Sequence, residues 1–470
     1  MNSSISEKIL QISGRPKRFN GTIRLPASKS YLHRALFVSA LAFGTSTLTN
    51  CGNEVNDDIQ ASLSALIALG VKITKSKSQG GSFHVSSGTS KSSEITLNAG
   101  GSGTTARFLI PFSTLTPPGT RVKIFGNKSL SNRPMESIFQ PLAKLGVKVT
   151  PLGEEGKLPL QIEGGGIHGG SCVVDGSVSS QFVSSLMISC TKANSDTTIS
   201  IENPEKQVSS PYIEATIRVL RDFGLKIRTT KFSGGKYSSF KISGGQIVPG
   251  NKFVVPGDMS SAAAIIGAAI AAEGQVRLTN AGRKQFPQPD SVIVRVARMF
   301  GAEVHEENGN ISVVYKKQNR TNKEIQLDFK TSPDLVPAVA GIAAATGSKV
   351  SISNIEHLRF KESDRIAVLC RELMKIGIEA EWDGSALRVS ASHPKMSKED
   401  VILISPEGDH RMLMALTIAG LSGRFGTIKI EEPDCVRKSY PSFIADLQKL
   451  CHEKSTVRIV NSKIVEALEA

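Results

Sequence analysis

The segment SLSALIALGVKI, residues 62–73, decides the fold because the chain repeats it. Matching segments are FQPLAKLGVKV (139–149), IRVLRDFGLKI (217–227), RVARMFGAEV (295–304) and CRELMKIGIEA (370–380). Their glycines, Gly70, Gly146, Gly224, Gly301 and Gly377, are 76, 78, 77 and 76 residues apart. Each segment has the pattern of an amphipathic helix end, a glycine where the chain reverses, and a strand. A weaker match, FIADLQKLCHEK (443–454), extends the series, so six units of about 77 residues are predicted.

Each repeat contains a second predicted helix, which begins with a small polar residue and continues with apolar ones. Ser or Asp at such a start is typical of an N-cap. The segments are SKSYLHRALFVSAL (28–41), SGTTARFLIPF (102–112), SSQFVSSLMIS (179–189), DMSSAAAIIGAAI (258–270), SPDLVPAVAGIAAAT (332–346) and DHRMLMALTIAGL (409–421). Strand-like segments such as TIRL, RVKIF and TTISI separate the helices. The predicted fold class is therefore α/β or α+β, built from strand-helix units.

The length of the chain indicates that the six repeats form two domains of three. A chain of 470 residues exceeds the size at which one core keeps growing. A turn-rich stretch around Pro256 and Gly257 follows the third repeat, and a matching crossing is expected near Pro26 and Ala27. We therefore predict one domain at 27–256 and another made of 1–26 with 257–470.

The composition argues against several classes of protein. Six cysteines are scattered without a CxxC pair, so neither structural zinc nor a disulfide framework is expected. The first 19 residues lack the apolar core of a signal peptide, and the longest run of small apolar residues, 262–272, is too short to cross a membrane. We expect a cytoplasmic protein with no metal site and no membrane partner.

The net charge of +15 favours an anionic partner, either a nucleic acid or a small molecule. The basic tract KKQNRTNK (316–323) is interpreted as a solvated hairpin loop. Few aromatic residues lie among the basic ones, which argues against binding of single-stranded nucleic acid. Cations also stand at predicted helix starts, where the macrodipole favours anions. They are Lys29, Arg34, Arg107, Arg133, Lys361, Arg365, His410, Arg411 and Lys438. We therefore expect a positive inter-domain cleft that holds small polyanions.

Nine short motifs point to one family. In order they are LPASKSYLHRAL, GGSGTTARFL, SNRPM, SVSSQF, SPY, SPD, RFKESDR, GDHRM and RKSYP. The chain resembles the 5-enolpyruvylshikimate-3-phosphate (EPSP) synthase family in this order and over nearly its full length. The resemblance implies two domains, each of three strand-helix repeats, that close over the substrates. It also implies transfer of the enolpyruvyl group of phosphoenolpyruvate to the 5-hydroxyl of shikimate 3-phosphate, in chorismate and aromatic amino acid biosynthesis. The implied chemistry is addition and elimination with no cofactor, and the implied state is a monomer.

The resemblance also implies roles for individual residues. The implied catalytic residues are Lys29, Asp334, Glu362 and His410. Shikimate 3-phosphate would contact Lys29, Ser30, Arg34, Ser179, Ser180, Gln181, Ser209, Tyr212, Asp334, His357 and Lys361. Phosphoenolpyruvate would contact Lys29, Gly103, Arg133, Gln181, Glu362, Arg365, Arg411 and Lys438. Whether Asp334 or Glu362 deprotonates the 5-hydroxyl stays open, and Arg107 is left outside the catalytic set.

Three positions depart from the common family pattern. Gly101 stands where asparagine is frequent, Phe108 where proline is frequent, and His357 where asparagine often contacts the shikimate. These changes affect the expected shape of the phosphoenolpyruvate pocket and hence sensitivity to glyphosate, which occupies it in this family.

Two alternatives remain. One is the sister enzyme that acts on UDP-N-acetylglucosamine, which usually carries a reactive cysteine just before the SNRP-like arginine; here no cysteine lies between Cys51 and Cys172. The other is a non-catalytic polyanion-binding or RNA-binding repeat protein, whose affinity would depend strongly on salt.

Overall fold

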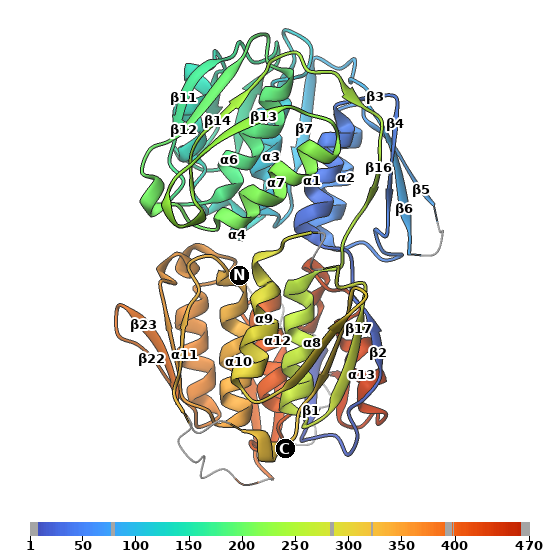
Figure 1. Ribbon diagram of the computed structural model, residues 1–470, viewed down its shortest axis with the longest axis vertical. Coiled ribbons are helices and arrows are strands. Elements are labelled where there is room, and N and C mark those ends of the chain that lie inside the picture. The colour runs from blue at the N-terminus through green and yellow to red at the C-terminus, as the bar shows by residue number, and fades with distance from the viewer. Residues whose placement is uncertain are drawn as a thin grey trace. The chain divides into compact units, whose positions relative to one another are not determined.

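The chain forms two compact units (Figure 1). The structure, a computed structural model, describes residues 8–76, 80–282, 286–320, 323–390, 397 and 399–461. The first unit contains Ala27–Pro256 together with residues 286–289, and the second contains the remaining described residues. The chain passes between the units at Pro26–Ala27 and at Pro256–Gly257, and it visits the first unit again at 286–289.

The assignment of all of 257–470 to one domain is wrong for residues 286–289. The ring of Phe286 packs edge-on against the rings of Tyr31 and Phe253, with centroids 5.4 and 5.7 Å apart. These aromatic contacts attach the segment to the first unit. No local sequence pattern predicts them.

In the described part of the chain each unit contains three four-stranded sheets, and the short strands Ala42–Phe43 and Val248–Pro249 of the first unit form a further two-stranded pair. The strands of the first unit are β3 (Ala42–Phe43), β4 (Thr45–Thr49), β5 (Lys72–Ser76), β6 (Ser82–Ser86), β7 (Glu94–Asn98), β8 (Arg121–Phe125), β9 (Val149–Pro151), β10 (Leu160–Glu163), β11 (Gly170–Val174), β12 (Thr197–Ile201), β13 (Ile227–Lys231), β14 (Tyr237–Ile242), β15 (Val248–Pro249) and β16 (Lys252–Val254). Those of the second are β1 (Lys8–Ser13), β2 (Thr22–Arg24), β17 (Gln275–Thr279), β18 (Glu303–Glu307), β19 (Asn310–Val314), β20 (Ile325–Asp328), β21 (Val350–Ser353), β22 (Glu379–Trp382), β23 (Ala386–Ser390), β24 (Val401–Ile404), β25 (Thr427–Glu431) and β26 (Val457–Asn461).

The six sheets follow one plan, in which an edge strand pairs in parallel with its neighbour and the next two pairings are antiparallel. The orders in the first unit are β16-β4-β6-β5, β7-β8-β10-β9 and β11-β12-β14-β13. In the second unit they are β2-β17-β19-β18, β20-β21-β23-β22 and β24-β25-β1-β26. The predicted six-fold repeat and mixed α/β class are confirmed.

The helices of the first unit are α1 (Lys29–Ala40), α2 (Asp57–Ala68), α3 (Gly103–Ser113), α4 (Lys128–Ser131), α5 (Phe139–Lys144), α6 (Ser180–Ser189) and α7 (Ser210–Asp222). Those of the second are α8 (Met259–Ala271), α9 (Ile293–Met299), α10 (Val336–Thr346), α11 (Arg365–Lys375), α12 (His410–Gly420) and α13 (Phe443–Cys451). Helices α8, α10 and α12 pack against one another, and almost all of their residues are buried. Helices that are apolar all round belong in such a core.

At each of the two crossings, an edge strand belongs to a sheet of one unit and leads directly into a helix of the other. Strand β2 pairs with β17 but leads into α1, and β16 pairs with β4 but leads into α8. Strand β1 lies between β25 and β26, so residues from both ends of the chain complete one sheet.

The repeated glycines all reverse the chain in the left-handed region. Their φ angles are 98° at Gly70, 81° at Gly146, 75° at Gly224, 95° at Gly301 and 76° at Gly377. Glycine adopts this conformation without a Cβ penalty. The sixth repeat uses His452 instead, with φ 56°, which explains its weaker match in sequence.

The basic tract from Lys316 is wrongly predicted as a hairpin. It connects β19 and β20, which belong to different sheets. Residues Lys316, Lys317 and Gln318 are exposed, so the expectation of a solvated loop is met there.

Two further properties of the described chain concern membrane-spanning helices and cysteines. None of its helices combines the length and apolar character needed to span a membrane. All six cysteines carry free thiols. Burial raises the pKa of the Cys51 and Cys172 thiols to about 12, so they are poor nucleophiles.

Candidate active site

Four helices of the first unit begin close together. The guanidinium of Arg34 in α1 donates to Thr216 Oγ1 (2.7 Å) and Tyr212 O (3.0 Å), which lie in the first two turns of α7. Gln181 Nε2, in the first turn of α6, donates to Thr104 Oγ1 of α3 at 2.9 Å. The free N–H groups of these helix ends therefore gather in one region, which suits anions.

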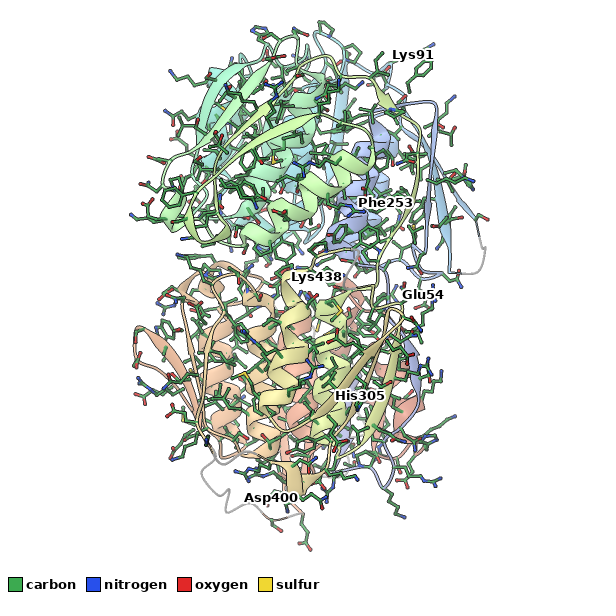
Figure 2. The ribbon with its side chains drawn as sticks, in the orientation of Figure 1. Glu54, Lys91, Phe253, His305, Asp400 and Lys438 are labelled. Carbon is green, nitrogen blue, oxygen red and sulfur yellow. The ribbon has the colours of Figure 1, made fainter. Side chains whose placement is uncertain are left out.

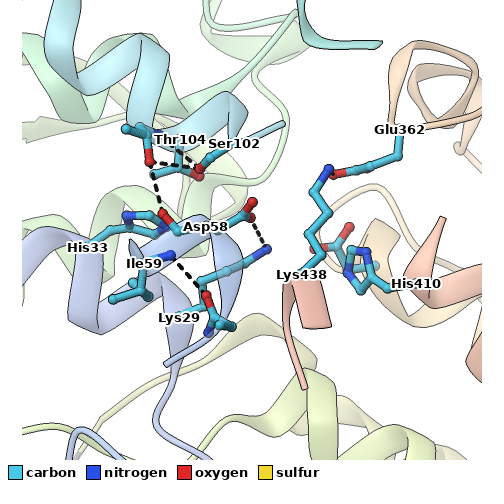
Figure 3. Close-up of polar contacts among 12 residues, drawn as sticks. Lys29, His33, Asp58, Ile59, Ser102, Thr104, Glu362, His410 and Lys438 are labelled. Carbon is cyan, nitrogen blue, oxygen red and sulfur yellow. Dashed lines mark hydrogen bonds and ion pairs between the residues drawn. The ribbon is translucent and has the colours of Figure 1, made fainter. Parts of the chain in front are cut away.

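Lys29, the first residue of α1, forms an ion pair with Asp58 in the first turn of α2. Its Nζ lies 2.7 Å from Asp58 Oδ2, and the two side chains are only 17% and 6% exposed (Figure 3). Thr105 Oγ1 lies 3.2 Å from the backbone oxygen of Asp58. The pair fixes the direction of the Lys29 ammonium.

A chain of buried hydroxyls supports the start of α3. The Oγ atoms of Ser62 and Thr105 are 2.8 Å apart, and Thr105 donates to Ser102 Oγ at 2.8 Å. His33 Nδ1 lies 2.9 Å from Ser62 Oγ. Burial lowers the pKa of His33 to about 3, so the ring is neutral. Ser102 caps α3 by accepting from Thr105 N at 3.2 Å, which holds the adjacent Gly103 in place.

Two arginines flank Gly103. A Cβ at this position would lie 3.1 Å from Arg133 Nη1 and 3.2 Å from Arg107 Nη1, so a side chain would crowd both guanidinium groups. Arg107 Nη1 also donates to Gln181 Oε1 at 2.8 Å. Two guanidinium groups at the N-terminus of α3 have the charge and geometry that suit a phosphate or carboxylate.

Arg34 is buried and links three helices. Its Nη1 donates to the backbone oxygen of Ser30 (2.8 Å), and its guanidinium carbon lies 5.7 and 6.0 Å from the ring centroids of Phe108 and Tyr212. Burial lowers the pKa of Arg34 to about 10, so it remains charged at neutral pH. Phe108, one of the departures from the family pattern, thus packs against a predicted ligand-binding residue.

The predicted serines lie at helix starts. Ser179 is the N-cap of α6 and accepts from Gln181 N at 3.2 Å, while Ser180 is the first residue of that helix. Ser209 is the N-cap of α7 and has a left-handed backbone with φ 54°. A residue other than glycine in this conformation is strained, and such strain is concentrated at functional sites.

In the second unit, Arg365 stands among three carboxylates. Its Nε donates to Asp409 (2.8 Å), Nη1 to Asp334 (3.0 Å) and Nη2 to Glu362 (2.8 Å), and its side chain is 1% exposed. Burial by itself would lower the pKa of Arg365, but Asp409, Glu362 and Asp334 outweigh it and raise that pKa. Arg365 is therefore a permanent cation that holds the acidic residues together.

Asp334 also accepts two contacts from Arg411. Arg411 Nη2 donates to its Oδ2 at 2.9 Å and Nη1 to its backbone oxygen at 3.2 Å, and Lys361 Nζ lies 3.8 Å from its Oδ1. Burial would raise the pKa of Asp334, but Arg411, Lys361 and Arg365 hold it well below the usual range. Asp334 is thus ionised.

Glu362 pairs with Lys438 as well as with Arg365. Lys438 Nζ lies 3.2 Å from Glu362 Oε1, and the two side chains point toward one another in Figure 3. Both retain some exposure to solvent, so a ligand can reach this pair more readily than it can reach Arg365.

The two predicted histidines lie in different surroundings. His410 is fully buried as the first residue of α12, with Nδ1 3.7 Å from Oδ1 of the N-cap residue Asp409. Among the described residues, His357 Nε2 is buried and finds no hydrogen-bond partner. Burial and the charge of Lys361 lower the pKa of His357 to about 4, so it is neutral near pH 7.

The prediction that the cations stand at helix starts is confirmed for Lys29, Arg365 and His410. It is wrong for Arg133, which follows α4, because Pro134 disfavours a helical conformation at the preceding residue. It is also wrong for Lys438, the last residue of a 3-10 helix (Pro433–Lys438) that begins at a proline.

Sequence reasoning gave no role to Asp58 or Asp409 and counted Arg107 only among the cations at helix starts, yet all three lie among the predicted residues. Arg107 is four residues after Gly103 and hence on the same helix face, a signal that could have included it. Asp409 is visible in the GDHRM motif as an N-cap. Asp58 is 29 residues from Lys29, and no local pattern joins them.

The comparisons with known proteins agree with one another. The family model for EPSP synthase (3-phosphoshikimate 1-carboxyvinyltransferase) matches residues 14–447. A 3-phosphoshikimate 1-carboxyvinyltransferase of Korarchaeum cryptofilum is 34% identical over 443 residues, covering 93% of this chain and 98% of that protein. One of Haemophilus influenzae is 33% identical over 441 residues, covering 92% and 96%.

Solved structures show the same fold. An EPSP synthase from Acinetobacter baumannii matches with a TM-score of 0.73 and 25% identity, covering 97% of this chain and 100% of that one. The enolpyruvyl transferase NikO from Streptomyces tendae matches in fold, with a TM-score of 0.72 and 17% identity, covering 97% and 99%.

The six-sheet fold is therefore that of an enolpyruvyl transferase. The family match is more specific: the chain belongs to the EPSP synthase family. The resemblance and the enzyme class expected from the sequence are confirmed, and neither the UDP-N-acetylglucosamine enzyme nor a non-catalytic binding protein is favoured.

Proposed function

We propose that the two groups of residues described above, one in each unit, jointly carry out the reaction of this family on phosphoenolpyruvate and shikimate 3-phosphate. The enolpyruvyl group passes to the 5-hydroxyl of shikimate 3-phosphate, and phosphate is released. The main support is the pairing of two guanidinium groups around Gly103 with a hydrogen-bonded Lys29–Asp58 pair in the same unit. This combination offers an anion site next to a fixed ammonium group.

The first unit supplies the groups that suit shikimate 3-phosphate. Ser179, Ser180 and Ser209 stand at the N-termini of α6 and α7, where hydroxyls and backbone N–H groups bind phosphate. Arg34 fixes the backbone of Ser30 and Tyr212, whose side chains would contact the ring.

The groups for phosphoenolpyruvate come from both units. Arg133, with Arg107 beside it, would hold one anionic group at Gly103. Arg411 and Lys438 would hold another, since each pairs with a carboxylate, Asp334 or Glu362, that an anionic ligand can replace. Bidentate arginine contacts fit both phosphate and carboxylate.

Proton transfer requires an acid for the methylene carbon of phosphoenolpyruvate and a base for the 5-hydroxyl. Lys29 and Glu362 are placed for acid-base work by Asp58 and Lys438. Asp334 is a weak base while Arg411 binds it. If the phosphoenolpyruvate carboxylate bound Arg411 in place of Asp334, the pKa of Asp334 would rise. Substrate binding would then itself make Asp334 a better base.

Because the proposed residues belong to two units, the units must close around the substrates. A decrease in the radius of gyration on addition of both substrates, measured by small-angle X-ray scattering, would support closure. The monomeric state and the cytoplasmic location stay predictions; light scattering after gel filtration measures the first.

Release of inorganic phosphate from phosphoenolpyruvate tests the proposed function. The purified protein is given shikimate 3-phosphate, UDP-N-acetylglucosamine or no acceptor in parallel. Release with shikimate 3-phosphate alone supports the proposal. Release only with the nucleotide sugar, or no release with either acceptor, would overturn it.

A further inference from the structure

Residues 286–290, here called the strap, connect the start of α1 with the second unit. The first four of them pack in the first unit, and Asp290 lies in the second. Phe286 is the anchor, because its ring contacts Tyr31 of α1 and Phe253 of β16, the latter labelled in Figure 2. The Arg218 guanidinium of α7 lies 5.5 Å from the centroid of the same ring.

The strap also forms hydrogen bonds on both sides of Lys29. Tyr31 Oη donates to the backbone oxygen of Pro287 at 2.8 Å, and Ser28 Oγ donates to Gln288 Oε1 at 3.2 Å. Ser28 and Tyr31 are each 1% exposed. These contacts bracket the residue that we place in proton transfer.

Ser28 differs from the serine N-caps of α3 and α6 in the same unit. In α3 and α6 the cap serine accepts a hydrogen bond from its own helix, as Ser102 and Ser179 do. Ser28 makes no such cap contact, and its hydroxyl is directed to Gln288 instead. A helix end without its side-chain cap is less stable than a capped one. The hydrogen bond from Ser28 to the strap therefore replaces part of the stabilisation that a side-chain cap would give to the start of α1.

The other end of the strap is held in the core of the second unit. Asp290 is buried, and its Oδ2 accepts from Ser260 Oγ in the first turn of α8. Asp258, the N-cap of α8, accepts from Ser260 N at 3.1 Å. The strap is thus anchored at a helix start in each unit.

We propose that the strap is a positioning element for the transfer reaction, in which Phe286, Pro287 and Gln288 fix the first turn of α1 and the Lys29 side chain that it carries. The proposal rests on the proposed function, because it assigns Lys29 to proton transfer. A displacement of a reacting group by about 1 Å can lower a rate about a hundredfold. Loss of the anchor therefore acts mainly on the chemical step.

The first test compares Phe286→Ala with Phe286→Tyr, which keeps an aromatic ring, and with Phe43→Ala as a matched control. Phe43 belongs to the same unit but is 82% exposed. We expect Phe286→Ala to lower kcat by about ten- to a hundredfold, with the KM of each substrate within about threefold of the parent value. Phe286→Tyr and Phe43→Ala are expected to keep kcat within about threefold. A kcat of Phe286→Ala within about twofold of the parent would overturn the proposal.

The second test does not depend on activity. Hydrogen exchange of a peptide spanning residues 28–36 is expected to be faster in Phe286→Ala and in Ser28→Ala than in the parent and in Phe43→Ala. Unchanged exchange in both variants would overturn the strap proposal even in an active enzyme. A parent protein that releases no phosphate would instead overturn the proposed function, while the exchange result still decides whether the strap fixes α1.

Tyr31→Phe covers the case in which Phe286→Ala does not fold. It keeps the ring contact with Phe286 and removes only the hydrogen bond to Pro287. Loss of one such bond corresponds to about a two- to tenfold change. We expect a decrease in kcat of that size together with faster exchange in 28–36, and no change in either quantity would overturn the proposal.

Discussion

Arg411 holds Asp334 at two points: its Nη2 donates to the carboxylate Oδ2 at 2.9 Å, and its Nη1 donates to the backbone oxygen at 3.2 Å. The other carboxylate oxygen accepts from Arg365 Nη1 at 3.0 Å. Arg365 is enclosed by three carboxylates and its side chain is 1% exposed, whereas the Arg411 side chain is 10% exposed. A substrate anion can therefore reach Arg411 more readily than Arg365.

Glu362→Gln is expected to lower turnover by about a hundredfold or more, because the amide can no longer exchange a proton at the reacting centre. The amide oxygen can still accept from Lys438 or Arg365, so the fold and the affinity for shikimate 3-phosphate are expected to be retained. Phosphate release measures the first quantity, and calorimetric titration with shikimate 3-phosphate measures the second. Unchanged turnover would remove Glu362 from the mechanism.

Lys29→Ala is expected to abolish turnover and also to destabilise the protein. It leaves the nearly buried Asp58 carboxylate without its ammonium partner, which costs about 1–3 kcal/mol in the free energy of unfolding. The double variant Lys29→Ala with Asp58→Ala is expected to regain most of that stability but no activity. Urea unfolding and phosphate release distinguish the two effects. Additive losses of stability in the double variant would show that the pair is not coupled.

Arg365→Met is expected to destabilise the second unit by about 3–5 kcal/mol, because it leaves Asp334, Glu362 and Asp409 without a shared cation. Arg121→Met is the matched control. The Arg121–Glu94 pair is exposed on both sides, and such pairs contribute about 0–1 kcal/mol. Urea unfolding of both variants measures the difference. Equal, small effects would contradict the role of Arg365 as the central cation.

The stability of the protein is expected to fall as pH rises toward neutrality because of Asp290. Burial and the charge of Asp334 raise the pKa of Asp290 to about 7, with a further contribution from Asp258, although Arg411 and Ser260 act in the opposite direction. An unfolded aspartate titrates near pH ~4. Between about pH 4 and about pH 7 the folded state thus holds a proton that the unfolded chain has lost, so stability decreases with pH.

Asp290→Asn removes this titration and still accepts from Ser260 through its amide oxygen. The variant is expected to gain stability relative to the parent by up to about 1.4 kcal/mol per pH unit across that window. Urea unfolding of both proteins near pH ~5 and pH ~8 measures the gain. A difference between variant and parent that does not change with pH would contradict the shifted pKa of Asp290.

Several parts of the candidate site could be read from local sequence. Ser179 and Asp409 were recognisable as helix starts, and both are N-caps in the structure. Gly103 was expected to contact phosphoenolpyruvate, and two guanidinium groups lie next to the place that a side chain would occupy there. The predictions that Arg133 and Lys438 stand at helix starts were wrong. A proline near a cation can mark the end of a helix as well as its beginning.

The amino-acid sequence by itself determined the six-fold repeat, the reversal of the chain at Gly70 and its four counterparts, and the membership of the family. These features are local, since helix periodicity and a left-handed turn depend on residues within a few positions of each other. Only the tertiary structure decided that Lys29 pairs with Asp58, that three carboxylates enclose Arg365, and that residues 286–289 pack against α1. Such contacts join residues far apart in the chain, and the packing of helices and sheets selects among the many partners that charge or apolar character alone would permit.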